Sequence, residues 1–222
     1  MVQPFLKWAG GKRWFVKNHD DLLPEKFNCY YEPFLGSGAV FFHLEPKEAV
    51  LSDANPHLIE TYQAIKDDWR QVLHYLKKHQ RHHDKDYYYE MRGRNCKTKH
   101  TRAAKFIYLN RTCWNGLYRE NLKGVFNVPI GTKTAVVLDT DDFEEVSRIL
   151  QNVDLKYCDF EKTIARAESG DFIFVDPPYT VAHNNNGFVK YNQNIFSWED
   201  QVRLSINSVS YTHLTLPTTP YV

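Results

Sequence analysis

The sequence has little cysteine and no long apolar run, and each of these features excludes a class of protein. Its 222 residues include four Cys, with no C-x-x-C pair and no spacing typical of zinc ligands. We therefore expect reduced thiols, as in a cytoplasmic protein, and no metal site. No stretch of about 18 apolar residues is present, and the first residues lack the basic–apolar–small order of a secretory signal. We expect neither a membrane span nor a secretory signal.

The sequence also lacks a large net charge, but the charge is unevenly distributed. The formal net charge is +1, whereas Arg92–Lys133 alone contains ten Lys/Arg and one acid, Glu120. That segment therefore carries +9 and the remainder −8. The asymmetry predicts a surface that faces a polyanion, and the alternative is a solvated basic face without a partner. The ten cations are Arg92, Arg94, Lys97, Lys99, Arg102, Lys105, Arg111, Arg119, Lys123 and Lys133.

The hydrophobic pattern predicts an α/β protein in which a long insertion separates two pairs of strands. Residues 28–42 read as a strand, a glycine turn and a helix, which is the opening of a nucleotide-binding unit. The apolar run 172–175 is typical of a strand at the centre of a parallel sheet. We also expect strands at 49–53 and 153–157, helices at 55–78, 102–110, 142–151 and 198–206, the last capped by Ser197, and a hairpin within 112–131.

A group of histidines within and just after the first long helix has near-helical spacing: His74, His79, His82 and His83. No acid or thiol completes a metal ligand set beside them. We therefore interpret the group as a solvated helix face.

The strongest local signal is Asp176-Pro177-Pro178-Tyr179, directly after the apolar strand. Ligands of open α/β sheets lie beyond the carboxyl ends of the strands. The two prolines stiffen the turn and leave carbonyl groups free to accept hydrogen bonds. A carboxylate, a rigid carbonyl and an aromatic ring suit a planar ring that bears an NH2 group, because two acceptors hold the amino hydrogens while Tyr179 stacks on the ring. The alternative is a surface turn.

A glycine turn followed by an acid predicts a nucleoside-bearing cofactor. Gly36 and Gly38 lie in the turn after the first strand, and Asp53 ends the next strand, where an acid can hold ribose hydroxyls. The turn lacks the third glycine of G-x-G-x-x-G, which disfavours a nicotinamide-dependent oxidoreductase. No phosphate loop of the type found in NTPases is present.

Several motifs in one order give the sequence a resemblance to a known family. Together they resemble site-specific DNA adenine-N6 methyltransferases of the Dam type (D12 class), over residues 3–206. The resemblance implies a Rossmann-like S-adenosylmethionine-dependent methyltransferase sheet with a mainly helical target-recognition insertion, double-stranded DNA as partner, and rotation of the target base out of the duplex. The motifs are F-L-K-W-A-G-G-K at 5–12, E-P-F-L-G-S-G at 32–38, N-G-L-Y-R at 115–119, G-V-F-N-V-P at 124–129 and D-P-P-Y at 176–179.

The same resemblance assigns roles to individual residues of this chain. Because the D-P-P-Y motif supplies no Cys or Ser nucleophile beside a base, we expect the methyl group to pass directly from the cofactor to the base, without a covalent enzyme intermediate. The catalytic residues would be Asp176, Pro177, Pro178 and Tyr179. The cofactor would be bound by Trp8, Lys12, Gly36, Gly38, Asp53, Asp159, Phe160 and Asp176, with Asp159 and Phe160 at its adenine. DNA would be contacted by Asn115, Leu117 and Arg119.

The domain boundaries follow from this assignment. We expect residues 1–56 and 152–206 to form the catalytic and cofactor-binding core, 57–151 the DNA-recognition insertion, and 207–222 a non-native tail. The tail contains no Asp, Glu, Lys or Arg and is rich in Ser, Thr and Pro. The last core strands of the family would then be missing. We also expect a monomer.

Two other functions remain open from the sequence. An S-adenosylmethionine-dependent enzyme that methylates RNA or a protein amide uses a similar catalytic tetrapeptide, but it does not need the 115–129 motifs in a basic insertion. An inactive fragment that binds only DNA or cofactor is the non-enzymatic alternative. The recognised DNA site, and whether the protein serves a restriction-modification system or a phage, are not encoded in these motifs.

Overall fold

Four parallel strands form the centre of the computed structural model, which describes residues 2–116, 118–121, 124–178 and 196–209. Their order in the sheet is β3-β2-β1-β4. The order reverses at β1, and such a switch point opens a crevice at the carboxyl ends of the strands. The α/β, Rossmann-like fold class is therefore confirmed. The strands are β1 (Tyr30–Glu32), β2 (Ala49–Asp53), β3 (Val153–Tyr157) and β4 (Phe172–Ile173).

The fourth strand is shorter than the apolar run that predicts it. Residues 172–175 are all buried, but only Phe172 and Ile173 pair with β1 in the ladder. One more hydrogen bond follows, from Phe174 N–H to the Tyr31 carbonyl at 2.8 Å. Pro177 and Pro178 have no N–H to continue the ladder. The chain therefore leaves the sheet where the D-P-P-Y segment begins.

The helices begin where side chains cap them. Asn55 Oδ1 accepts hydrogen bonds from the N–H groups of His57 and Leu58, and Pro56 occupies the first turn. Ser197 and Asp200 likewise exchange hydrogen bonds at the start of the last helix. The helices are α1 (Arg13–Asn18), α2 (Ala39–Leu44), α3 (Pro56–His82), α4 (Lys85–Gly93), α5 (Lys99–Thr112), α6 (Phe143–Leu150), α7 (Phe160–Ile164) and α8 (Trp198–Val209), with 3-10 turns η1 (Asp20–Leu22) and η2 (Trp114–Gly116).

Several of these helices differ in length from the predicted ones. Helix α3 continues to His82 across a kink at Asp68, and α8 continues to Val209 rather than ending at residue 206. Helix α4 lies in a stretch without clear periodicity, where Asp84 accepts a hydrogen bond from Tyr87 N–H and caps it. Helix α5 is longer than 102–110 because a capping box formed by Thr98 and Thr101 starts it early. Capping side chains therefore determine helix ends that the spacing of apolar residues alone does not define.

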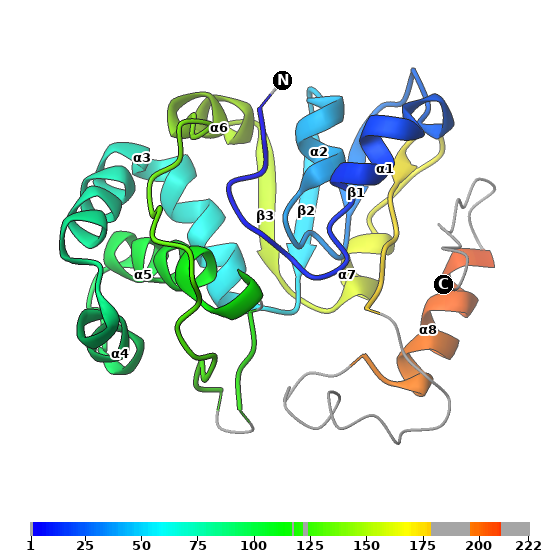
Figure 1. The fold of residues 1–222 in the computed structure, drawn as a ribbon. Coiled ribbons are helices and arrows are strands. Elements are labelled where there is room, and N and C mark those ends of the chain that lie inside the picture. The colour runs from blue at the N-terminus through cyan, green and yellow to red at the C-terminus, as the bar shows by residue number, and fades with distance from the viewer. Residues whose placement is uncertain (1, 117, 122–123, 179–195, 210–222) are drawn as a thin grey trace.

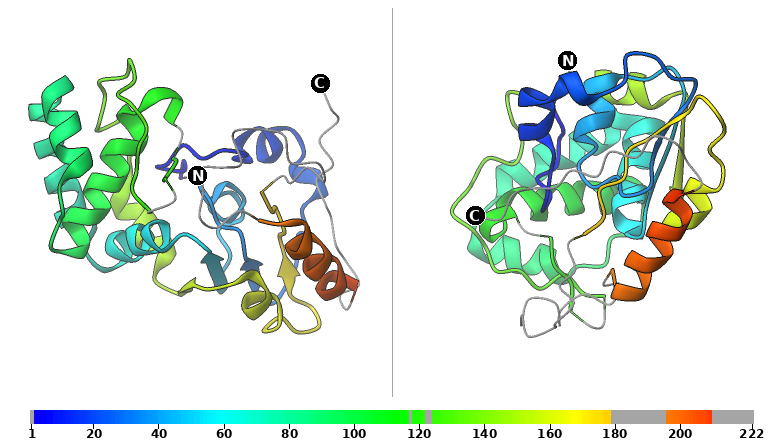
Figure 2. Two further views of the ribbon diagram at one scale, coloured as in Figure 1. Left: turned by 90° about the horizontal axis from the view of Figure 1, so that it is seen from below. Right: turned by 90° about the vertical axis from the view of Figure 1, so that its right-hand side faces the viewer.

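Helices α3, α4 and α5 form a lobe beside the sheet (Figure 1). One hydrophobic core runs without interruption from the strands into this lobe, since Leu51 of β2 and Tyr108 of α5 belong to the same cluster. The opposite face of the sheet packs on α7 and α8 through a smaller cluster that includes Ile164 and Leu204. The N-terminal segment lies between the lobe and the sheet (Figure 2, left). In the described ranges, no helix combines the length and hydrophobicity that crossing a bilayer requires.

Helix α5 binds the N-terminal segment through two consecutive buried side chains. Asn110 accepts a hydrogen bond from Lys7 N–H at 3.0 Å and donates one to the Lys7 carbonyl at 2.7 Å. Arg111 donates to the Phe5 carbonyl at 2.9 Å and forms a bidentate ion pair with Asp141, both bonds at 2.6 Å. The interpretation of Arg111 as part of a polyanion-facing surface is therefore wrong, because its side chain is only 5% exposed.

Other cations of the basic segment are also paired with acids outside it. Arg102 pairs with Glu60, Lys99 with Asp67 and Arg94 with Glu90. With Asp141, these acids reduce the uncompensated charge of the segment from +9 to +5. The surface is basic, but less so than the linear count suggests.

The histidine group is not uniformly solvated, which corrects the interpretation from the sequence. His79 is buried in the lobe, and its Nδ1 lies 2.8 Å from the Tyr87 hydroxyl. Burial lowers the pKa of His79 to about 4. His83 Nδ1 contacts the Tyr108 hydroxyl at 2.9 Å. These two histidines complete a partly buried network with the lobe's tyrosines.

Candidate functional site

An acidic residue lies at, or just beyond, the carboxyl end of each of these strands. Glu32 ends β1 and Asp53 ends β2, while Asp159 and Asp176 follow β3 and β4 by two and three residues. The four strands run parallel, so these acids lie along one edge of the sheet, the lower edge in Figure 1. Such an edge, beside the switch point at β1, is where α/β folds bind ligands.

Asp176 is held by a lysine from the N-terminal segment. Lys12 Nζ lies 2.6 Å from Asp176 Oδ2, and both side chains are largely buried. The same Nζ donates to the Gly10 carbonyl at 2.8 Å. Burial raises the pKa of Asp176, whereas the Lys12 ammonium acts in the opposite direction. The pair therefore gives the carboxyl group a fixed orientation at the end of β4.

A second buried acid lies next to this pair and was not recognised from the sequence. Glu32 is 3% exposed and accepts a hydrogen bond from the Tyr30 hydroxyl at 2.9 Å. Burial raises the pKa of Glu32 well above its usual value, and the charge of Asp176 adds to that effect. The signal was present, since Glu32 ends an apolar strand within the E-P-F-L-G-S-G motif.

The glycine turn and Asp53 form one hydrogen-bonded unit. Gly36 N–H donates to Asp53 Oδ2 at 3.1 Å, and Asn55 N–H donates to Asp53 Oδ1 at 2.9 Å. Burial raises the pKa of Asp53 to about 6, against the lowering effect of these N–H groups. The Tyr62 hydroxyl donates to the Gly36 carbonyl at 3.3 Å and fixes the other side of the turn.

Trp8 packs against the glycine turn so closely that only glycine fits at position 36. A Cβ at Gly36 would lie 2.7 Å from Trp8 Cδ1, and the φ of +49° also favours glycine. The other neighbours of the indole are Phe106 and Tyr118, whose ring centroids lie 6.2 Å and 5.6 Å away. Trp8, Gly36 and Asp53 therefore meet at one place, and Gly38, with φ of +66°, completes the turn.

Asp159 and Phe160 lie at the same edge, after β3. Phe160 is buried and stacks on Phe34 of the glycine turn, with ring centroids 5.4 Å apart. Asp159 caps α7 by accepting from Glu161 N–H at 3.0 Å, and it pairs with Arg203 of α8 at 2.8 Å. The structure thus gives Asp159 two protein partners, and the cofactor role that the resemblance implies stays a prediction.

The predicted DNA contacts lie on a hairpin that extends from the end of α5. Bridges pair Cys113 with Ile130 and Glu120 with Phe126, which confirms a hairpin in this segment. Asn115 adopts a φ of +55°, and Arg119 Nε donates to Asn127 Oδ1 at 3.0 Å. Leu117 lies outside the described residues, as does Tyr179 of the D-P-P-Y motif.

Two exposed residues beside Asn115 were not assigned a role from the sequence. The Trp114 side chain is 53% exposed. Lys7 packs along Gly116, where a Cβ would lie 2.6 Å from Lys7 Cδ. The turn therefore presents an indole, an amide and an ammonium together. Sequence spacing could not reveal this group, because Lys7 is more than a hundred residues away in the chain.

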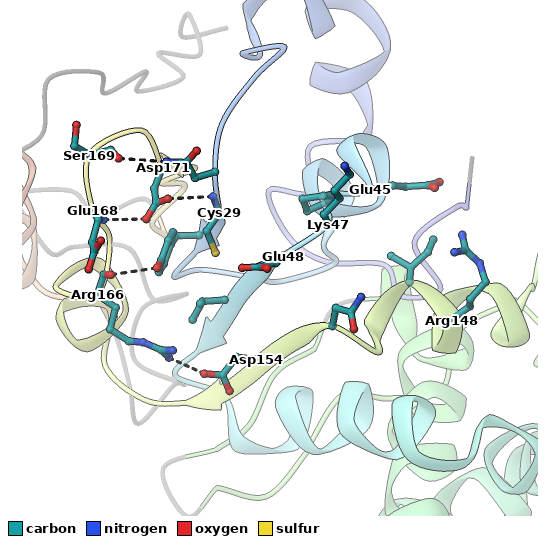
Figure 3. Close-up of a pocket in the computed structure, with 17 residues that line it drawn as sticks. Cys29, Glu45, Lys47, Glu48, Arg148, Asp154, Arg166, Glu168, Ser169 and Asp171 are labelled. Carbon is teal, nitrogen blue, oxygen red and sulfur yellow. Dashed lines mark hydrogen bonds and ion pairs between the residues drawn. The ribbon is translucent and has the colours of Figure 1, made fainter.

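The sheet also has a hollow of about 1290 Å³ at its opposite end, at the amino ends of the strands (Figure 3). Some of its charged groups pair with one another or with nearby backbone. Arg166 pairs with Asp154 at 2.7 Å, and Asp171 accepts a hydrogen bond from Cys29 N–H at 3.0 Å. None of the motif residues that the sequence singled out lines this hollow, so it is separate from the candidate site.

Comparisons with known proteins agree with the motifs at the carboxyl edge. A family model described as D12 class N6 adenine-specific DNA methyltransferase matches residues 8–212. The chain is 42% identical over 212 residues to the type II methyltransferase M1.LlaDCHI of Lactococcus lactis subsp. cremoris, covering 91% of this chain and 75% of that protein. It is 36% identical over 226 residues to the type II methyltransferase M.MjaIII of Methanocaldococcus jannaschii, covering 92% and 78%. It is 35% identical over 208 residues to the DNA adenine methylase of Haemophilus influenzae, covering 91% and 73%.

Proposed function

Because the chain belongs to the D12 class of N6 adenine-specific DNA methyltransferases, we propose that it methylates adenine within a short, specific site in double-stranded DNA, with S-adenosylmethionine as donor and the target base rotated out of the helix. The proposal rests on the arrangement of three groups of residues. The oriented Asp176–Lys12 pair, the Gly36–Asp53 unit and Trp8 lie together at the carboxyl edge of the sheet.

The residues at this edge fit a nucleoside cofactor. Any side chain at position 36 would collide with Trp8, so glycine there lets the indole pack directly on the turn of the proposed cofactor site. Asp53 offers a carboxylate to ribose hydroxyls, and Phe160 offers an apolar ring to an adenine. When bound, S-adenosylmethionine supplies a sulfonium methyl group, so that one N–C bond forms, one C–S bond breaks and the amine gives up one proton.

Asp176 would hold the amino group of the target base. Its carboxylate and the Pro177 carbonyl each accept one amino hydrogen, which makes the nitrogen lone pair less delocalised into the ring and more available to attack the methyl carbon. Lys12 fixes the carboxylate by an ion pair, so little reorganisation is needed when the base arrives. These residues align the amine with the methyl group and do not react with it themselves. Alignment of this kind can lower the activation free energy by roughly 7–11 kcal/mol.

The hairpin would hold the DNA while the base is extruded. Asn115 and Arg119 can read base edges, and the exposed Trp114 indole can stack on bases left without a partner. Lys7, beside Gly116, places a positive charge at the same surface. Extrusion is required because N6 of a paired adenine cannot reach a site at the edge of the sheet.

Radiolabelled methyl transfer to unmethylated plasmid DNA tests the proposal, with RNA and a glutamine-containing protein as parallel substrates. We expect label in DNA alone, at N6 of adenine after nuclease digestion. Asp176→Ala should reduce transfer at least about a hundredfold, a larger loss than any accompanying loss of cofactor affinity. Asp154→Ala, at the opposite end of the sheet, is the matched control and should keep activity. Label in RNA or protein instead of DNA, or normal turnover by Asp176→Ala, would overturn the proposal.

A further inference from the structure

Tyr118 of the recognition hairpin contacts the proposed cofactor corner through Trp8. The two rings stack with centroids 5.6 Å apart, and Trp8 packs on Gly36, whose N–H donates to Asp53. Gly36, Asp53 and Trp8 belong to the proposed cofactor site. Tyr118 therefore joins them to the segment proposed to contact DNA.

From these contacts we infer that Tyr118 is a positioning residue with two separable roles: its aromatic ring holds Trp8 against the cofactor turn, and its hydroxyl holds the recognition hairpin. The inference rests on the proposed function, because it assumes that Trp8 serves the cofactor and the hairpin serves DNA. Neither the motif pattern nor the roles implied by the resemblance assign a function to Tyr118.

The first role follows from the position of the indole. The indole of Trp8 packs on Gly36 and also stacks on the ring of Tyr118, with the two ring planes inclined by only 20°. Tyr118 is itself supported by Phe106 at 4.7 Å and Phe126 at 5.5 Å between ring centroids. A smaller side chain at position 118 would remove the nearer of the two rings that stack on the indole, the other being Phe106. Trp8 could then rotate away from the turn.

The second role follows from the partners of the hydroxyl group. The Tyr118 hydroxyl donates a hydrogen bond to Glu120. Glu120 is bridged to Phe126 across the hairpin, so the hydroxyl fixes the pairing of its two arms. Burial raises the pKa of the Tyr118 phenol, with Glu120 contributing, and the group therefore remains a donor at neutral pH.

Glu120 also explains why the hydroxyl acts on DNA binding rather than on the cofactor. It is the one acid among ten cations between Arg92 and Lys133. It directly follows Arg119, and its carboxylate lies 3.9 Å from His57 Nε2 at the start of α3. When Tyr118 and His57 hold it, Glu120 is kept at the base of the hairpin. Without the hydroxyl, the carboxylate can turn toward the surface proposed to face phosphates, where it would repel them.

Two substitutions at the same position separate the roles. Tyr118→Phe keeps the ring and removes the hydroxyl, whereas Tyr118→Leu removes both. In steady-state methylation of unmethylated plasmid DNA, Phe should raise KM for DNA about fivefold to tenfold and leave KM for S-adenosylmethionine within about twofold. Leu should raise KM for S-adenosylmethionine about tenfold as well. Thermal melting of each variant confirms that it is folded, and Phe is expected to fold because it retains the packing.

The outcomes are decisive in both directions. A rise in KM for DNA alone in the Phe variant, together with a rise in both KM values in the Leu variant, supports the two roles. Equal changes of both constants in the Phe variant would reveal a general structural role and overturn the inference. Wild-type values for either variant would also overturn it. If the wild-type protein transfers no methyl group to DNA, the proposed function fails instead, so the two failures are distinguishable.

Discussion

The carboxyl edge of the sheet and the basic segment Arg92–Lys133 show how differently sequence patterns translate into structure. At the edge, motifs separated by more than a hundred residues meet as expected, because parallel strands bring their ends together. In the basic segment, charge counted along the chain overstates the charged surface. Arg111 and Arg119 are the same residue type eight positions apart, yet one is buried against Asp141 and the other lies on the hairpin. Position is set by topology, whereas the role of a charge is set by a partner elsewhere in the chain.

Removing Arg111 should give the largest loss of stability. Arg111→Ala leaves Asp141 buried without its ion-pair partner and deprives the Phe5 and Val136 carbonyls of a donor. Breaking a buried pair in this way costs about 3–5 kcal/mol in the free energy of unfolding. Urea denaturation monitored by circular dichroism measures this change in the free energy of unfolding.

Arg119→Ala is the matched control for that measurement, because it removes the same side chain from the hairpin. Its unfolding free energy should remain within about 0.5 kcal/mol of the wild-type value. Equal destabilisation by the two variants would contradict the contrast between a structural and a surface arginine.

The second prediction concerns DNA affinity, for which Arg119→Ala should have a larger effect than Arg111→Ala. Arg119→Ala should weaken binding to cognate DNA by about 1–3 kcal/mol if the guanidinium reads a base edge. Fluorescence anisotropy at fixed salt, with cognate and scrambled duplexes, measures both affinity and discrimination. An unchanged affinity together with an unchanged site preference would remove Arg119 from the recognition surface.

The sequence predicted the sheet and the residues at its edge because both depend on local patterns. The turn at Gly36, the acid at Asp53 and the D-P-P-Y segment after β4 each follow an apolar strand. The Lys12–Asp176 pair, the Asn110 clamp on Lys7 and the stack of Tyr118 on Trp8 could not be predicted in the same way. Each joins segments that no periodicity relates. A linear pattern shows that a residue is polar or aromatic but does not show which distant residue it contacts.

Asp53 gives a third prediction, smaller than the first two and dependent on pH. Its pKa is raised to about 6, so in the free protein the carboxyl group becomes protonated as pH falls through that value. A neutral carboxyl group binds ribose hydroxyls less well than a carboxylate. Affinity for S-adenosylmethionine should therefore fall below pH 6 by up to about tenfold, or 1.4 kcal/mol, for each pH unit. Isothermal titration calorimetry at pH 8, 6 and 5 measures the trend, which should be absent in Asp53→Asn.

The same carboxyl group should affect stability with the opposite sign. Its folded-state pKa lies above the model-peptide value of about 3.9, so the folded protein holds the proton more strongly than the unfolded chain. Its contribution to the free energy of unfolding therefore decreases as pH rises from about 4 to 6. The pH dependence in Asp53→Asn, subtracted from that of wild type, isolates this contribution. If binding and stability moved in the same direction with pH, the group responsible would not be Asp53.

The smallest effect is expected at Arg102, which lies between the two extremes of the comparison. Its guanidinium pairs with Glu60, with Nε 2.8 Å from Oε2, but the side chain is 38% exposed and water screens the interaction. Arg102→Ala should therefore lower the free energy of unfolding by no more than about 1 kcal/mol, and less in high salt. DNA affinity should change less than in Arg119→Ala, because Glu60 already neutralises this cation. A loss of DNA affinity as large as that of Arg119→Ala would show that an ion-paired arginine still serves the DNA surface. The linear charge count would then describe that surface better than the paired structure does.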